Sequence, residues 1–170
     1  MNVSTAVRLK RAVRQFQNKP LPAEAVQVIL NAGRRAQSAK NVQPWQFIAI
    51  QNKTILRALS ECGTWAGHLA GAALGMAIVT PLPESRFSVM FDAGQAAAYM
   101  QLAAWEMGIG SCLATIYDME NARRLLDFPQ NLTLYVAISF GYPLDETSLT
   151  STPQKGGRRA LNETVHWEKW

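Results

Sequence analysis

The apolar residues of this chain fall in short runs that predict helices and strands in mixed order. Runs rich in aromatic and β-branched residues favour strands, and four such runs occupy residues 45–50, 74–80, 111–116 and 132–140. Apolar residues spaced three and four apart indicate helices, here over residues 5–12, 22–36, 53–59, 92–107 and 119–126. This mixture predicts an α+β domain.

The helix expected over 92–107 is apolar on most of its sides. Asp92 suits the positive N-terminal end of a helix, and Gly108 can close the helix in the left-handed conformation. Its apolar surface is interrupted by three polar residues, Gln95, Gln101 and Glu106. A helix apolar on most sides must be buried, so we expect part of this helix to pack against a second subunit.

The composition predicts one folded domain that spans residues 1–170. Of the 170 residues, 48% are apolar and 17% are charged, which argues against disorder. Cys62 and Cys112 are too few for a disulfide scaffold, so we expect reduced, buried thiols. The longest apolar stretch, residues 69–79, is shorter than the ~20 residues of a membrane-spanning helix. These features, with no signal-peptide pattern at residues 1–13, predict a cytoplasmic protein that does not enter a membrane.

Positive charge is concentrated in the first third of the chain. Residues 1–60 carry ten Lys or Arg and one acid, a net charge of +9. Residues 61–170 carry seven bases and eleven acids, a net charge of −4, so that the whole chain has a charge of +5. Such a basic region suggests an anionic partner, which could be a nucleic acid, an anionic membrane or a phosphorylated ligand.

The chain lacks the residue patterns of protein-borne catalysis. It contains no HExxH, CxxC, GxGxxG or P-loop motif. Its two imidazoles, His68 and His166, lie far apart in sequence and beside no recognisable nucleophile motif. We therefore assign no catalytic side chain and no metal site, and expect a cofactor to carry any reaction.

Three short segments combine basic or polar residues with bends in the chain. They are residues 10–14, residues 38–45 and residues 156–159. Guanidinium groups bind phosphate through paired, charge-assisted hydrogen bonds, and glycine allows a close backbone approach. Each segment also has an ordinary explanation: a solvated helix end, a helix–strand connection and a surface turn, respectively.

The order of these segments resembles the nitroreductase family of flavin enzymes. Lys-Arg-Ala-Val-Arg-Gln-Phe stands at 10–16, and Asn-Val-Gln-Pro-Trp-Gln-Phe stands at 41–47. Further similar segments are the Ala-rich helix from Asp92, the turn at 107–112, Phe-Gly-Tyr-Pro at 140–143 and the tail at 158–167. The resemblance implies a three-layer α+β fold in which helices flank a mixed, mainly antiparallel sheet. It also implies a homodimer that binds FMN at the subunit interface.

The resemblance also assigns cofactor-binding residues. It places one group at the FMN phosphate: Lys10, Arg11, Ala12, Arg158 and Arg159. A second group would lie around the isoalloxazine ring: Arg14 and His68 at its pyrimidine edge, and Thr115 and Ile116 at a strand end. Ser38 and Asn41 would come from the other subunit. Many relatives have Ser where this chain has Ala12, and Pro where it has Gln37.

The implied function is an oxidoreductase that uses NADH or NADPH to reduce nitroaromatics, quinones or similar electron-poor acceptors. Hydride transfer would pass through flavin N5 in a ping-pong cycle. Other reactions of the same fold remain alternatives, namely dehalogenation, ring dehydrogenation and flavin fragmentation. A nucleic-acid-binding module is a third hypothesis, but the basic segments lack the interleaved aromatics of single-strand binders, so we expect no nucleic-acid partner.

Overall fold

Four strands form one antiparallel sheet in the computed structural model, which describes residues 3–151 and 157–170. The strands are β1 (Gln46–Ile50), β2 (Leu74–Pro81), β3 (Gly110–Thr115) and β4 (Leu132–Gly141). Their order across the sheet is β1-β2-β4-β3, and each neighbouring pair is antiparallel. β3 is thus at one edge of the sheet and pairs with β4, the last strand in the sequence.

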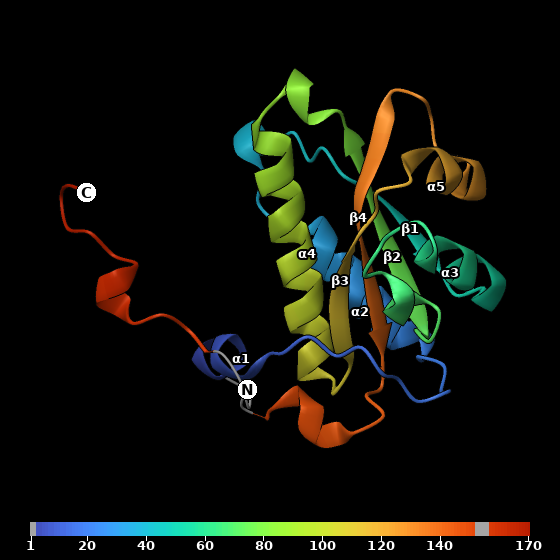
Figure 1. The fold of residues 1–170 in the computed structure, drawn as a ribbon, viewed down its shortest axis with the longest axis horizontal. Helices are drawn as coiled ribbons and strands as arrows, with labels where there is room; N and C mark the ends of the chain where they lie inside the picture. The colour runs from blue at the N-terminus through green and yellow to red at the C-terminus, as the bar shows by residue number, and fades with distance from the viewer. Residues whose placement is uncertain (1–2, 152–156) are drawn as a thin grey trace.

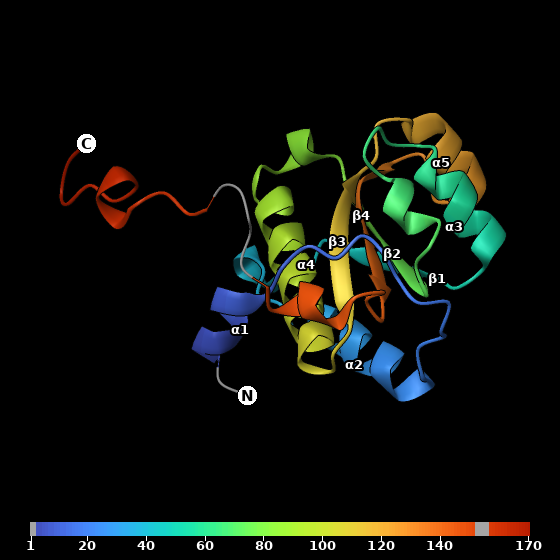
Figure 2. The same cartoon turned by 60° about the horizontal axis from the view of Figure 1, so that its bottom comes forward.

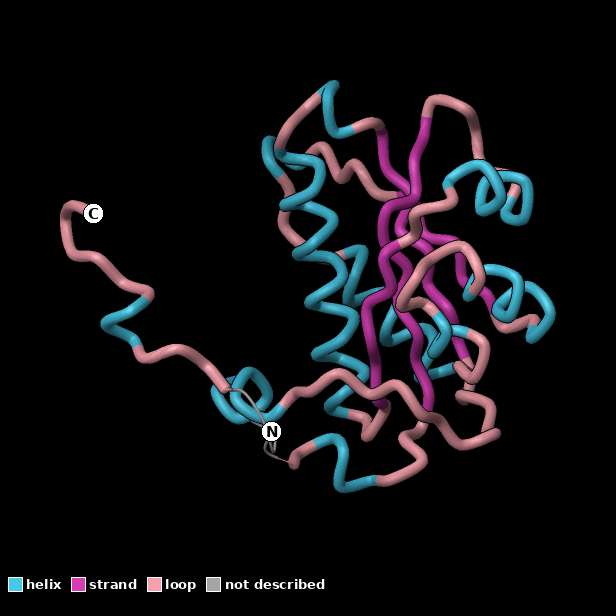
Figure 3. The backbone as a smooth tube through the Cα atoms, in the orientation of Figure 1, coloured by secondary structure: helices cyan, strands magenta, loops and turns pink. Residues whose placement is uncertain are grey.

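Helices cover both faces of this sheet, as Figures 1 and 3 show. One face carries α2 (Ala23–Arg34) and α4 (Ser88–Glu106), and the other carries α3 (Lys53–Ser60) and α5 (Met119–Leu126). The helix α1 (Val3–Leu9) lies near the C-terminal end of α4. Short 3-10 turns are η1 (Ala39–Asn41), η2 (Gly67–Leu69), η3 (Pro83–Ser85), η4 (Glu146–Leu149) and η5 (Leu161–Glu163). No helix of the described ranges has both the length and the apolar character to cross a membrane.

Each face of the sheet has its own hydrophobic core. Because side chains alternate along a strand, neighbouring residues of β2 and β4 point to opposite faces. Met76 and Ile138 pack with α2 and α4, whereas Ala77 and Ala137 pack with the α3 side. The three-layer α+β arrangement expected from the sequence is thus confirmed.

Most predicted elements are confirmed, and apart from the first helix and the start of α4 their ends differ by at most two residues. Asn52 and Asp118 cap α3 and α5, and Gly108 adopts the left-handed φ of +73° after α4. The predicted start of α4 was wrong, since the helix begins at Ser88, four residues before Asp92. Val89 is buried on the same side as the helix core, which favours this extra turn and moves Asp92 into the helix interior.

The first two helices also begin elsewhere than predicted. α1 spans Val3–Leu9 rather than residues 5–12, because Lys10 already leaves the helix toward the sheet edge. In α2, Pro22 is the N-cap residue with extended backbone angles, so the first helical residue is Ala23.

Candidate functional site

The outer edge of β3 is the feature around which several predicted site residues gather. β3 pairs with β4 on one side only, and the segment that follows α1 lies along its other side through a parallel bridge between Ala12 and Ser111. The N–H of Val13 donates to the carbonyl of Ser111 at 3.0 Å. Since backbone groups alternate in direction along an antiparallel edge, Leu113 and Thr115 point their N–H groups the same way as Ser111, away from β4. The edge beyond Val13 therefore offers backbone donors.

Two basic side chains from this segment lie close to β3. Burial lowers the pKa of Lys10, and the nearby thiol of Cys112 partly opposes this by raising it. Burial raises the pKa of Cys112, whereas Arg14 and Lys10 lower it by their positive charge. The structure thus brings Lys10 and Arg14 to the same stretch of the β3 edge, with Arg14 exposed to solvent.

Arg11 and Ala12 occupy different positions from their neighbours. The Nη1 of Arg11 donates to the carbonyls of Arg8 and Lys10 at 2.8 and 3.0 Å, which caps the C-terminal end of α1. Its Nε is buried and has no hydrogen-bond partner among the described residues. Ala12 is exposed beside Ser111. The Arg11 guanidinium therefore serves the helix end through Nη1, while its buried Nε is left without a partner in the described part of the chain.

His68 lies in η2, buried against the sheet on the side away from α4. Its Nδ1 is 2.7 Å from the hydroxyl oxygen of Ser139, which in turn is 3.3 Å from the carbonyl oxygen of Cys112. Burial lowers the pKa of His68; the Leu113 carbonyl raises it and Arg14 lowers it further. The imidazole is therefore held neutral beside Arg14. Ser139 was not among the predicted site residues, although a serine between Ile138 and Phe140 in an apolar run signals a specific hydrogen bond.

This burial makes folding stability depend on pH. Because the pKa of folded His68 is lower than its ordinary value of 6.5, the unfolded chain binds the proton more readily. The contribution of His68 is present above that value and is lost as pH falls toward the folded pKa. We expect His68→Gln to reduce the increase in stability between about pH 5 and 7, measured by denaturant unfolding at several pH values. Equal slopes in both proteins would contradict the assignment.

A tight loop closes the far end of the β3 edge. The N–H groups of Tyr117 and Asp118 donate to the Cys62 carbonyl at 2.9 and 3.0 Å. At Gly63, an added Cβ would lie 2.2 Å from the carbonyl oxygen of Thr115. Thr115 is exposed and Ile116 is buried, so this strand end presents the backbone and the Thr115 side chain rather than Ile116. The open part of the edge is therefore bounded by Ala12 and Gly63.

The contact at Gly63 leads to a stability prediction. Because a backbone carbonyl cannot move aside as a flexible side chain can, Gly63→Ala should destabilise the fold by about 1–3 kcal/mol. At this chain length that is a fall in Tm of roughly 2–4 °C for each kcal/mol. Gly67→Ala is the matched control, since a Cβ there meets nothing within 4 Å. The midpoints of thermal unfolding of the two variants test this prediction, and equal midpoints would contradict it.

Ser38 and Asn41 lie at the opposite end of α4 from this edge. The N–H of Ala39 donates to Asp92 near the start of α4, whereas Gln101, farther along the helix, donates to the Ser111 hydroxyl at the β3 edge. Nine residues of helix separate the two contacts, about 14 Å of rise. Figure 1 shows η1 beside the N-terminal end of α4 and α1 near its other end. One chain therefore does not bring these residues to Lys10 and Arg14.

The C-terminal basic residues also stand apart from the edge. Arg158 and Arg159 are exposed, and Gly156 lies outside the described residues. The segment 157–170 extends away from the sheet and helices in both views of Figures 1 and 2. The single chain thus shows no convergence of this pair with Lys10.

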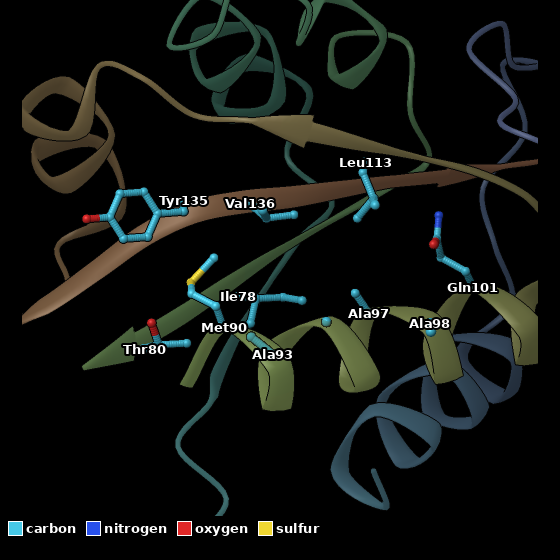
Figure 4. A pocket seen from close by; sticks show the side chains of 11 residues that line it. Ile78, Thr80, Met90, Ala93, Ala97, Ala98, Gln101, Leu113, Tyr135 and Val136 are labelled. Carbon is cyan, nitrogen blue, oxygen red and sulfur yellow. The ribbon is translucent and has the colours of Figure 1, made fainter. Parts of the chain in front are cut away.

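An apolar cavity of about 200 Å³ lies between α4 and the sheet. Figure 4 shows Leu113 and Gln101 at one end and Thr80 and Tyr135 at the other. Small α4 residues, including Ala93 and Ala97, form its floor. Since half of the Leu113 side chain is exposed, this cavity adjoins the β3 edge.

Large apolar side chains are exposed at the start and along the outer side of α4. They are Phe87, Met90, Phe91 and Tyr99. Clustered apolar exposure of this kind marks interaction surfaces more often than free surface.

Comparison with known proteins gives a family match over most of the chain. The model described as "Nitroreductase family" matches residues 7–62 and 62–142. A candidate NADH dehydrogenase/NAD(P)H nitroreductase of Archaeoglobus fulgidus is 29% identical over 168 residues, covering 95% of this chain and 94% of that protein. An iodotyrosine deiodinase of Thermotoga neapolitana is 26% identical over 163 residues, covering 80% and 86%.

A solved structure is also similar to this chain over its whole length. The FMN-dependent nitroreductase of Clostridium difficile R20291 superimposes with a TM-score of 0.85. It is 26% identical, and the match covers 99% of this chain and 100% of that one.

Proposed function

This chain belongs to the nitroreductase family, and from that premise we propose that it is an FMN-dependent oxidoreductase that takes electrons from NADH or NADPH. The observation that carries the proposal is the meeting of Lys10 and Arg14 with the outer edge of β3. The Archaeoglobus relative and the Clostridium structure support it, because their names specify the same reductants and cofactor. We propose that residues 1–170 act as a single domain.

The donors along the edge suit FMN. Lys10 and Arg11 would hold the phosphate by their positive charge, since both lie where α1 ends, and Arg158 and Arg159 would add charge if the tail folds back or comes from a second chain. The outward N–H of Thr115, with Ile116 behind it, would bind the ring edge. When bound, FMN supplies hydride acceptance and donation at N5.

Arg14, near the ring, would stabilise negative charge on the reduced cofactor. Arg14 is exposed at the edge, and beside it the imidazole of His68 is held neutral. A positioned guanidinium lowers the free energy of developing negative charge, most strongly where water is excluded. We assign no proton transfer to a side chain.

A homodimer would complete the site. A two-fold axis across α4 would pair two copies of the helix antiparallel, so that the start of one lies beside the end of the other. The partner would then bring its Ser38 and Asn41 to the edge that holds Lys10 and Arg14. The exposed apolar side of α4 supports this pairing.

The cavity beside Leu113 favours an acceptor with one ring. Its volume of about 200 Å³ is comparable with the ~150 Å³ of an engineered apolar cavity that binds benzene. Its apolar walls suit the ring of a nitroaromatic or a quinone. One-ring acceptors should therefore be reduced with lower KM than acceptors with two fused rings.

The test is spectroscopic. Purified protein, or protein reconstituted with FMN, should show flavin absorption that bleaches on anaerobic addition of NADH or NADPH and returns when an acceptor is added. The reductant that bleaches at lower concentration identifies the preferred nucleotide. Protein that takes up no FMN would exclude the proposal, and retention of a nucleic acid in a gel-shift assay at moderate salt would favour the nucleic-acid alternative.

Reductive dehalogenation is a second candidate function. The observation that favours it is the similarity to the Thermotoga deiodinase. Release of iodide from an iodinated phenol by the reduced, FMN-loaded protein, together with slow turnover of nitroaromatics, would support this alternative.

A further inference from the structure

The loop that contains Ser38 and Asn41 is held in an unfavourable backbone conformation. Lys40, Asn41 and Gln43 have φ angles of +54°, +55° and +51°. Residues other than glycine seldom occupy this left-handed region, and three of them within four positions store conformational strain. Contacts outside the loop must therefore hold it in place.

Two such contacts clamp the backbone of one residue, Ala39. Its N–H donates to Oδ1 of Asp92 at 3.1 Å, and its carbonyl accepts from Nη2 of Arg86 at 2.7 Å. Asp92 lies within α4, and Arg86 immediately precedes that helix. The clamp thus joins the strained loop to the helix that would form the subunit interface.

The Asp92 carboxylate is an unusual anchor. Its side chain is only 3% exposed, and its Oδ2 has no hydrogen-bond partner among the described residues. A buried carboxylate with one unpaired oxygen costs free energy that an apolar residue on the same helix face would avoid. Packing alone therefore does not account for a carboxylate at this position.

The clamped loop presents hydrogen-bond donors. The Ser38 hydroxyl oxygen already accepts from the N–H of Gln43 at 2.9 Å, which leaves its proton free to donate outward. Asn41 Oδ1 accepts from Gln43 Nε2 at 3.2 Å, so its amide NH₂ group remains for a further acceptor. Both residues therefore suit a ligand rich in acceptor oxygens, such as the carbonyl or ribityl oxygens of a flavin.

We propose that Asp92 and Arg86 are positioning residues that hold this loop so that Ser38 and Asn41 donate to the FMN bound by a second copy of the chain. The inference rests on the proposed function for the identity of the ligand. The clamp itself rests on the two contacts to Ala39.

A double-mutant cycle tests the positioning role. Asp92→Ala and Asn41→Ala should each weaken FMN binding about tenfold, measured by quenching of flavin fluorescence. The double variant should bind no more weakly than the weaker single variant, because a released loop no longer presents Asn41. Asp92→Asn keeps an acceptor for Ala39 and should bind within about threefold of the unchanged protein. Additive losses would overturn the proposal.

Proteolysis tests the clamp without the cofactor. The peptide bond after Lys40 is exposed, and trypsin should cleave it at least about ten times faster in Asp92→Ala and in Arg86→Ala than in Asp92→Asn. Equal cleavage rates would overturn the clamp, even if FMN binds normally. Faster cleavage in a chain that binds no FMN at all would instead overturn the proposed function and, with it, the role of the loop toward a flavin.

Discussion

Phe91→Glu is expected to yield a folded monomer that has lost flavin binding by at least about 100-fold. Phe91 lies on the outer side of α4 and is 74% exposed in the single chain. In a dimer built on this helix, each new carboxylate would be buried against the partner's α4 without a compensating charge. The monomer that remains keeps Lys10 and Arg14 but lacks the partner's loop. Sedimentation gives the oligomeric state, and titration with FMN gives the affinity.

Val28→Glu is the matched control for that experiment. Val28 is an exposed apolar residue of α2, away from the outer side of α4, and its substitution adds the same charge. This variant should remain dimeric and should bind FMN normally. A Phe91→Glu monomer with unchanged FMN affinity would show that each chain holds a complete site alone.

Arg14→Ala is expected to weaken FMN binding about 10- to 100-fold, which corresponds to the ~1.5–3 kcal/mol of a charge-assisted hydrogen bond. Arg14 is the exposed cation next to both Cys112 and His68, so its loss removes positive charge from the ring end of the edge. Arg35→Ala removes the same charge from the end of α2 and should leave the affinity unchanged. Equal affinities of the two variants would contradict the assignment of Arg14.

Mixing two deficient chains tests whether the site is shared. If Arg14 acts from one subunit and Asn41 from the other, a heterodimer of Arg14→Ala with Asn41→Ala contains one intact site. After random exchange of subunits, about a quarter of the sites should regain tight FMN binding. No recovery in a mixture shown to exchange subunits would mean that both residues act within the same chain.

Local signals explain which elements could be predicted. Strands follow from runs of β-branched and aromatic residues, and helix ends follow from residues such as Asn52, Asp118 and Gly108, whose bonds or backbone angles act within a few positions. The start of α4 was missed because Asp92 resembles an N-terminal residue. Its true partner, Ala39, lies 53 positions away.

The candidate site likewise has a part that could be predicted from the sequence and a part that could not. The segment 10–14 could be singled out from its sequence because guanidinium and ammonium groups that bind phosphate are recognisable by type. The pairing of His68 with Ser139 could not, since 71 positions separate them and only the packing of η2 against β4 brings them together.

The amino-acid sequence by itself determined the kinds of elements, the family resemblance and the concentration of positive charge before residue 60. Those properties depend on residue type, local spacing and the order of short segments along the chain. Only the tertiary structure decided that Lys10 and Arg14 reach the β3 edge while the loop of Ser38 and Asn41 is bound at Asp92, about 14 Å along α4 from the contact between Gln101 and β3. That separation results from long-range packing of a rigid helix against the sheet, and it is the physical reason to expect that two chains complete each site.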